Sequence, residues 1–173
     1  MNNTSGHIIE ISEDGDDAAS TTFTWDIFLL CGDPSDESTY FAGFPKEYVS
    51  PIAAPDNVNF DMDGNLWIST DGQPAPLGNA DGLYCVPTEG PQRGYVAQFM
   101  AVVAGAECAS FEFTRDNRNL FVSIQHPGES GTVEEPITMW PDGGPLVRPT
   151  VIQVWAEDGG RVGGGDVPPR WAR

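Results

Sequence analysis

The sequence predicts an all-β protein arranged as part of a β-propeller, and three observations support this. Short β-branched and aromatic runs follow one another along the chain. Twenty Gly and fifteen Pro residues, about a fifth of the 173 positions, lie between those runs and leave little room for long helices. A strand–turn–strand pattern also occurs twice, at a spacing close to one propeller blade.

The runs have the length and composition of ordinary strands. We expect strands within eight segments: 7–12, 21–30, 65–70, 82–88, 94–103, 109–114, 119–124 and 150–156. Asp-Gly pairs, which favour hairpin turns, separate several of them. These pairs are Asp14-Gly15, Asp63-Gly64, Asp71-Gly72, Asp142-Gly143 and Asp158-Gly159.

The repeat joins Phe60–Ser69 to Phe113–Ser123, with one inserted residue in the second copy. Each copy reads as the inner hairpin of a blade, which cannot cover both of its faces without neighbouring blades. Propellers close with about four to eight blades of about 40–50 residues, so this chain holds about three blades of an incomplete ring. We expect residues 1–158 to form the partial propeller and residues 159–173 a flexible C-terminal tail.

Within this arrangement, aromatic residues of the strand patterns are expected to be blade core: Trp25, Trp67 and Phe121. Three acids are predicted to lie in loops without a clear partner: Asp26, Asp33 and Asp81. The three cysteines lack metal-binding spacing and are expected to be small core residues.

The charge balance argues against some classes of binding partner. The net charge is −18, which repels phosphate backbones and anionic headgroups, so direct nucleic-acid or membrane binding is disfavoured. General solubility and adaptation to high salt remain open as explanations for the acidity. The first residues show neither a basic nor an apolar segment of an export signal, and no phosphate-loop, dinucleotide or nucleophile-elbow motif occurs.

Two groups of oxygen ligands stand just ahead of the predicted inner strands. Asp56 and Asn57 precede the strand Val58–Phe60, and Glu107 holds the equivalent place before Phe111–Phe113. Such oxygen-only ligands suit calcium, so these three residues are the predicted metal ligands. The alternative is that Asp56-Asn57 forms an Asx turn and Glu107 is solvated.

His126 and Glu129 follow the second inner hairpin. An imidazole and a carboxylate there are candidates for proton transfer or metal ligation. The alternative is that His126 orders its turn by bonding a backbone carbonyl. Asp71 stands at the equivalent exit of the first copy and is predicted to be a turn residue with an occasional ligand role.

Five segments, in order and spacing, resemble the C-terminal part of PhoX-type alkaline phosphatases, over about Ile8 to Gly160. They are TTFTWDIFLLCGDP, APDNVNFDMDGNLWISTDGQP, LYCVPTEGPQRGYVAQFM, GAECASFEFTRDNRNLFVSIQHPGE and WPDGGPLVRPTVIQVWAEDGG. The most distinctive motifs are PDN with FDMDGNLW, GAE, IQHPGE and WPDG.

The resemblance implies a six-bladed propeller that hydrolyses phosphate monoesters with calcium and iron ions in its channel. It also implies twin-arginine export to a periplasmic or extracellular location. Asp56, Asn57 and Glu107 match positions that resemble family metal ligands, and His126 and Glu129 match a family motif as candidate catalytic residues. The N-terminal half of such enzymes, with other metal ligands including a cysteine for iron, has no counterpart here. We therefore expect the isolated chain to be inactive, with missing N-terminal blades or self-association through open blade edges as its partners.

Two other functions stay open. One is a non-catalytic propeller module that binds calcium or a protein through exposed blade edges. The other is a lactonase-like calcium propeller, which the PDN and DGNLW strings also resemble but which IQHPGE does not fit.

Overall fold

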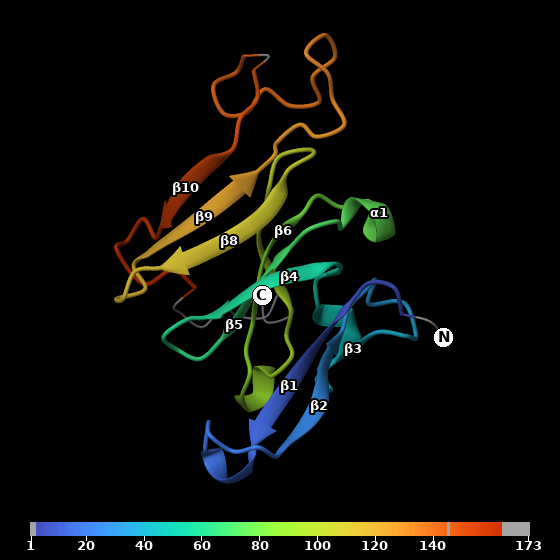
Figure 1. Ribbon diagram of the computed structural model, residues 1–173, viewed down its shortest axis with the longest axis vertical. Coiled ribbons are helices and arrows are strands. Elements are labelled where there is room, and N and C mark those ends of the chain that lie inside the picture. Colours follow the sequence, from blue (N-terminus) through green and yellow to red (C-terminus); the bar gives the residue numbers. More distant parts are fainter. Residues whose placement is uncertain (1–2, 145, 164–173) are drawn as a thin grey trace.

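A computed structural model describes residues 3–144 and 146–163. Ten strands in this part of the chain form three antiparallel sheets (Figure 1). The first sheet holds β1 (His7–Glu13), β2 (Phe23–Leu30) and β3 (Tyr40–Phe41). The middle sheet holds β4 (Pro55–Phe60), β5 (Leu66–Thr70), β6 (Gly82–Val86) and β7 (Ala97–Ala101). The third holds β8 (Glu107–Phe113), β9 (Asn119–Gln125) and β10 (Thr150–Trp155), and the short helix α1 (Pro74–Leu77) follows β5.

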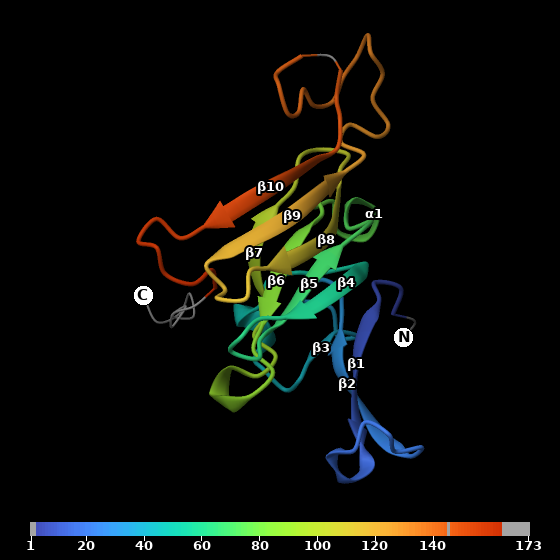
Figure 2. The ribbon, with the colours of Figure 1, turned by 60° about the vertical axis from the view of Figure 1, so that its left-hand side comes forward.

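The middle sheet is covered on both faces, which explains why every residue of β5 is buried. Leu66 and Ile68 belong to a core shared with Phe28 and Leu29 of the first sheet. Trp67, on the opposite face of β5, packs in a second core with residues of the third sheet. The middle sheet is thus a blade held between two neighbours, as the views in Figures 1 and 2 show.

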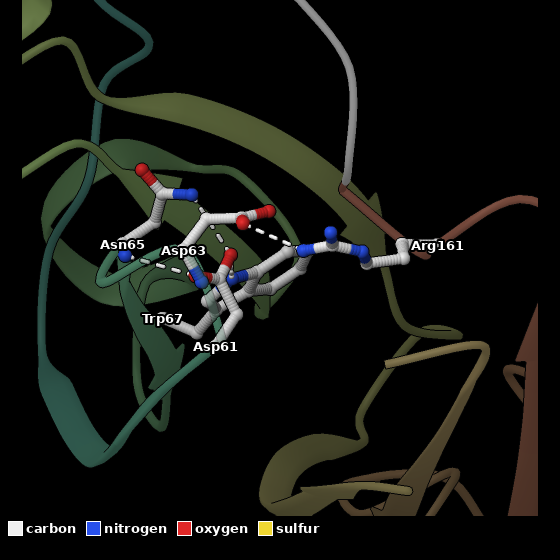
Figure 3. Close-up of polar contacts among 5 residues, drawn as sticks. All are labelled: Asp61, Asp63, Asn65, Trp67 and Arg161. Carbon is white, nitrogen blue, oxygen red and sulfur yellow. Dashed lines mark hydrogen bonds and ion pairs between the residues drawn. The ribbon is translucent and has the colours of Figure 1, made fainter. Parts of the chain in front are cut away.

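The turn between β4 and β5 is organised by one buried carboxylate (Figure 3). Asp61 Oδ2 accepts hydrogen bonds from Asn65 Nδ2 and Trp67 Nε1, both at 2.9 Å. Its Oδ1 accepts from the backbone N–H groups of Asp63 and Asn65, also at 2.9 Å. Asp61 is therefore fully engaged in fixing the turn and the core tryptophan.

Part of the expected tail packs against this turn. Arg161 Nη1 lies 2.6 Å from Asp63 Oδ1, and Val162 is buried in the second core with its N–H bonded to the Asn117 carbonyl. A Cβ at Gly163 would lie 2.5 Å from the ring of Trp67. Residues 164–173 lie outside the described residues.

The three sheets follow one another as blades of an open arc. β4 contacts β8, and β1 and β4 line a common groove, so the first strands of the three sheets are neighbours. This mostly-β, unclosed arrangement confirms the predicted partial propeller. Trp67 is core as expected, but the expectation was wrong for Trp25 and Phe121, which are 59% and 40% exposed. Both lie on the end sheets, and within residues 3–144 and 146–163 no further blade packs on the outer face of either sheet.

The strand boundaries also differ from expectation near the candidate ligands. β4 begins at Pro55, so Asp56 and Asn57 lie inside the strand, at an irregularity in its pairing with β5, rather than ahead of it. Glu107 is the first residue of β8. The two-residue strand β3 and helix α1 were not predicted, because neither is long enough to show a hydrophobic period.

Candidate metal centre

Three side chains from adjacent blades converge where β5 and β9 end and β8 begins. Asp71 directly follows β5, His126 directly follows β9, and Glu107 opens β8. One ligand atom from each residue lies within 4.8 Å of the others. Asp71 and His126 occupy equivalent exits of the two repeat copies, so the repeat itself brings them to one end of the arc.

Glu107 is the buried member of this cluster, with 8% of its surface exposed. It lies opposite Gln125 in the β8–β9 register, and Gln125 Nε2 donates a 2.8 Å hydrogen bond to Glu107 Oε2. His126 Nε2 lies 3.1 Å from the same oxygen. The other carboxylate oxygen of Glu107 takes part in neither contact.

His126 lies between two carboxylates. Its Nδ1 is 3.5 Å from Glu129 Oε2 and is buried without a hydrogen bond. Burial alone would lower the pKa of His126, but the hydrogen bond to Glu107 and the negative charge of Glu129 together raise it. The residue also has φ = 33°, a conformation that costs on the order of 1 kcal/mol and that concentrates at functional sites.

Backbone contacts fix the loop that carries Glu129. The Glu129 N–H donates to the Gly105 carbonyl at 3.1 Å, and the Gly128 N–H donates to the Ala104 carbonyl at 3.1 Å. Gly105 has φ = 67°, and a Cβ there would lie 2.7 Å from the Glu129 carbonyl oxygen. Glycine is therefore required for the segment before β8 to pack against the loop after β9.

Asp71 is held in place by a second, buried acid. Asp81 Oδ1 accepts three hydrogen bonds of 2.9 Å, from Thr70 Oγ1 and from the N–H groups of Gly72 and Gln73. Asp81 thus fixes the residues on both sides of Asp71. Partial burial raises the pKa of Asp71, and the negative charge of Asp81 raises it further.

Of the predicted ligands, the structure brings Glu107, His126 and Glu129 together. Asp56 is exposed and lines a groove of about 600 Å³ between β1 and β4, yet it is close enough for its charge to raise the pKa of Asp71. The N–H of Asn57 donates to Ser69 Oγ at 3.3 Å. Among the described residues, the Asn57 side chain makes none of the hydrogen bonds of the cluster.

The donor set fits a metal ion. Two carboxylates and an imidazole are ligands that first-row transition metals accept, whereas calcium prefers oxygen alone. The buried, unbonded Nδ1 of His126 is a further sign that the hydrogen bonding of this site is incomplete. Bound cations would also offset the repulsion among the neighbouring carboxylates.

Sequence reasoning gave Asp71 only a minor role and found no partner for Asp81. Asp71 stands in a Thr-Asp-Gly string that is typical of a turn, and the turn is real. One feature of the sequence did point to a larger role for Asp71: it directly follows the second strand of its repeat copy, as His126 does in the other copy. Nothing in the sequence pairs Asp81 with residues 70–73, because helix α1 separates them along the chain.

Comparisons with known proteins agree with this architecture. The sequence profile described as "Alkaline phosphatase PhoX" matches residues 1–128. The structure of Pseudomonas fluorescens PhoX, solved in complex with vanadate, a transition state analogue, is similar with a TM-score of 0.72 and 36% sequence identity. The match covers 92% of this chain but 28% of that protein, so this chain spans well under a third of its length. A search of curated proteins finds no match. By the extent of the profile match, the chain belongs to the PhoX family of alkaline phosphatases.

Proposed function

We propose that this chain is the C-terminal segment of a PhoX-like alkaline phosphatase and contributes one wall of its metal-binding channel. The observation that carries the proposal is the convergence of Asp71, Glu107 and His126 from two adjacent blades. A family relationship alone would be compatible with a decayed site, whereas this chain retains a buried carboxylate, an imidazole and a third acid in ligand range.

The reaction that fits this site is hydrolysis of phosphate monoesters. A phosphate dianion is repelled by a chain of net charge −18, so it needs cations to approach the acidic cluster. Bound metal ions supply that attraction and stabilise charge on the phosphoryl oxygens. The chain's own contribution is to hold the ligands rigidly, through Gln125 on Glu107 and through Asp81 on the loop of Asp71.

Two kinds of ion are expected from the donors. Asp71, Glu107 and His126 suit iron, because they combine oxygen with nitrogen. Asp56 and Glu129, whose charges both act on Asp71, offer oxygen ligands suited to calcium, with Asn57 beside Asp56 on β4. His126 and Glu129 are also the pair placed to exchange a proton with a leaving group or water.

The whole enzyme's activity requires parts that this chain lacks. It spans 28% of the related PhoX structure, so we expect the isolated chain to bind metal without turning over substrate. Within the described residues, no helix has the length and apolar character needed to cross a bilayer. Export to the periplasm or the cell exterior is part of the proposal.

Metal binding by the purified chain tests the site directly. We expect isothermal titration calorimetry with Mn²⁺, a stable substitute for Fe²⁺, to show binding that Glu107→Gln and Asp71→Asn each weaken at least about tenfold, as loss of one charged ligand predicts. Glu135→Gln, at an exposed acid outside the cluster, is the matched control. Equal affinities for all four proteins would refute the site.

Activity is the second test. The chain alone should leave a chromogenic phosphate ester intact with Ca²⁺ and Fe²⁺ present, and a longer polypeptide that carries the remaining blades should cleave it. Asp56→Ala in that polypeptide should abolish cleavage. Retained phosphatase activity would favour a non-catalytic role for this segment, and turnover of lactones in place of phosphate esters would favour the lactonase alternative.

A further inference from the structure

The connection between β9 and β10, residues 126–149, starts at the metal centre and is unusually long. Its described residues contain no helix or strand, and Figure 1 shows it as the orange segment beyond the end of β9. Residues 61–65 are enough to join β4 to β5, and residues 114–118 to join β8 to β9. Connections longer than about 12–15 residues without secondary structure are uncommon and are usually functional or disordered.

Hydrogen bonds within the connection give it a defined shape. The Gly131 N–H donates to the Gly128 carbonyl at 2.9 Å. Thr132 and Glu135 bond each other twice: the Thr132 N–H donates to the Glu135 carbonyl at 3.2 Å, and the Glu135 N–H donates to Thr132 Oγ1 at 2.9 Å. These bonds favour the functional explanation for the length of the connection over the disordered one.

A pocket of about 250 Å³ lies within this connection. Its walls come from residues 128–138 and from Val147, so the pocket does not depend on blades that this chain lacks. A Cβ at Gly128 would lie 3.2 Å from Thr138 Cγ2 and 3.3 Å from Val147 Cγ2. The apolar side chains of the wall are Val133, Pro136, Ile137 and Val147.

The lining of the pocket carries no charge. The same connection contains Glu129, Glu134 and Glu135, and the chain has 26 acidic residues, yet none of them lines the pocket. The Thr132 hydroxyl is already engaged by the N–H of Glu135. A lining of this kind accepts an uncharged, largely apolar group, because it offers a charged or strongly polar group nothing to replace its hydration.

The pocket lies beside the metal centre. Gly128, in its wall, stands between His126 and Glu129 along the chain, and consecutive Cα atoms are only about 3.8 Å apart. Ile137, also in the wall, has its Cδ1 3.0 Å from the position of a Cβ on Gly105, the glycine that contacts Glu129. A group in the pocket is therefore close to the imidazole and carboxylate that the proposed function places at the leaving group.

We propose that this pocket binds the organic group of the substrate, and that the preferred phosphate monoesters are those of compact, uncharged, apolar alcohols such as phenols. The proposal rests on the proposed function, because the metal centre has to hold the phosphate. An apolar cavity of about 150 Å³ is enough to bind benzene, so about 250 Å³ holds one aromatic ring. Val147 contacts that ring and is a specificity-determining residue.

Kinetics of the longer polypeptide that carries the remaining blades test the proposal. The values to compare are kcat/KM for phenyl phosphate and for methyl phosphate, each relative to the wild type. Val147→Phe fills the pocket and should lower the value for phenyl phosphate at least about tenfold more than that for methyl phosphate, within the discrimination of about 10–200-fold that apolar pockets achieve. Val147→Ala, which enlarges the pocket, should shift the preference from phenyl to 1-naphthyl phosphate.

Leu146→Phe is the matched control, because Leu146 is the neighbouring residue, is 78% exposed and does not line the pocket. It should leave both values unchanged. Equal losses for the two esters in Val147→Phe would overturn this inference and leave the proposed function intact. A polypeptide that cleaves neither ester would refute the proposed function, and the inference with it.

Nuclear magnetic resonance of the ¹⁵N-labelled chain tests the pocket without catalysis. Phenol should shift the amide signals of Gly131, Thr132 and Thr138, all in the pocket wall. The shifts should persist in Leu146→Phe and disappear in Val147→Phe, whose remaining signals report whether the fold is retained. Phenol that leaves the three signals in place, or shifts that survive Val147→Phe, would overturn the proposal.

Discussion

Asp81 should be a large single contributor to stability, although it lies outside the metal cluster. Asp81→Ala removes the acceptor of three hydrogen bonds in a position that is 4% exposed. The Thr70 hydroxyl can turn to the Gly82 carbonyl, which is already 3.4 Å away, so the N–H groups of Gly72 and Gln73 are left without partners.

The magnitude follows from these two donors. A buried donor left unsatisfied costs about 1–3 kcal/mol, and Gly72 is only partly buried, so water recovers some of its bond. We expect a loss of about 3 kcal/mol in the free energy of unfolding. For a chain of this size that corresponds to a fall in Tm of roughly 6–12 °C. Asp81→Asn keeps an acceptor oxygen and should lose less.

Thermal and urea unfolding followed by circular dichroism measure this loss. Asp33→Ala is a matched control: Asp33 Oδ1 also accepts bonds from a backbone N–H and a hydroxyl, both of Ser35, but Asp33 is exposed. Water replaces those bonds, so its Tm should change little. The reasoning fails if Asp81→Ala unfolds with the same midpoint as the wild type, or if both variants lose stability equally.

Three further outcomes are expected. Gly105→Ala should weaken Mn²⁺ binding in calorimetry, because the added Cβ collides with the backbone of Glu129. Gly143→Ala, at a glycine with a similar positive φ but open space around it, should leave binding unchanged. Equal affinities of the two variants would contradict the role of the contact between Gly105 and Glu129. Val162→Ala should lower the free energy of unfolding in urea by about 2 kcal/mol if residues 159–163 belong to the blade, and an unchanged midpoint would show that they do not. Native thiols should react slowly with a disulfide reagent at mildly alkaline pH and quickly after unfolding, and fast reaction of the native protein would contradict the raised pKa values of two buried thiols and one half-buried thiol. Burial raises the pKa of each thiol to about 12: Cys31, Cys85 and Cys108.

The sequence predicted the fold well because its signals are local. Alternating apolar residues and Asp-Gly turns predict the strands, and the spacing of the repeat predicts the blade. The same alternation misled the prediction for Trp25 and Phe121. Their patterns are typical of residues that pack against a neighbouring blade. Within the described residues, only the middle sheet has a neighbouring blade on both faces, and there Trp67 is fully buried.

The candidate site was harder to predict because it depends on contacts between blades. Motif positions pointed to Glu107 and His126, and the structure places their side chains 3.1 Å apart. Asp71 joins them only through the packing of one sheet on the next, which no local pattern records. Asp56 and Asn57 stay apart because β4 extends through them, and their predicted role as ligands still awaits a test.

The most direct test of the central claim is anomalous diffraction from crystals of the chain grown with Mn²⁺. We predict a single strong peak in coordination contact with Asp71, Glu107 and His126 together. A structure in which the ion lies elsewhere, or in which these three side chains point apart while the ion is bound, would contradict the assignment of this cluster as a metal centre.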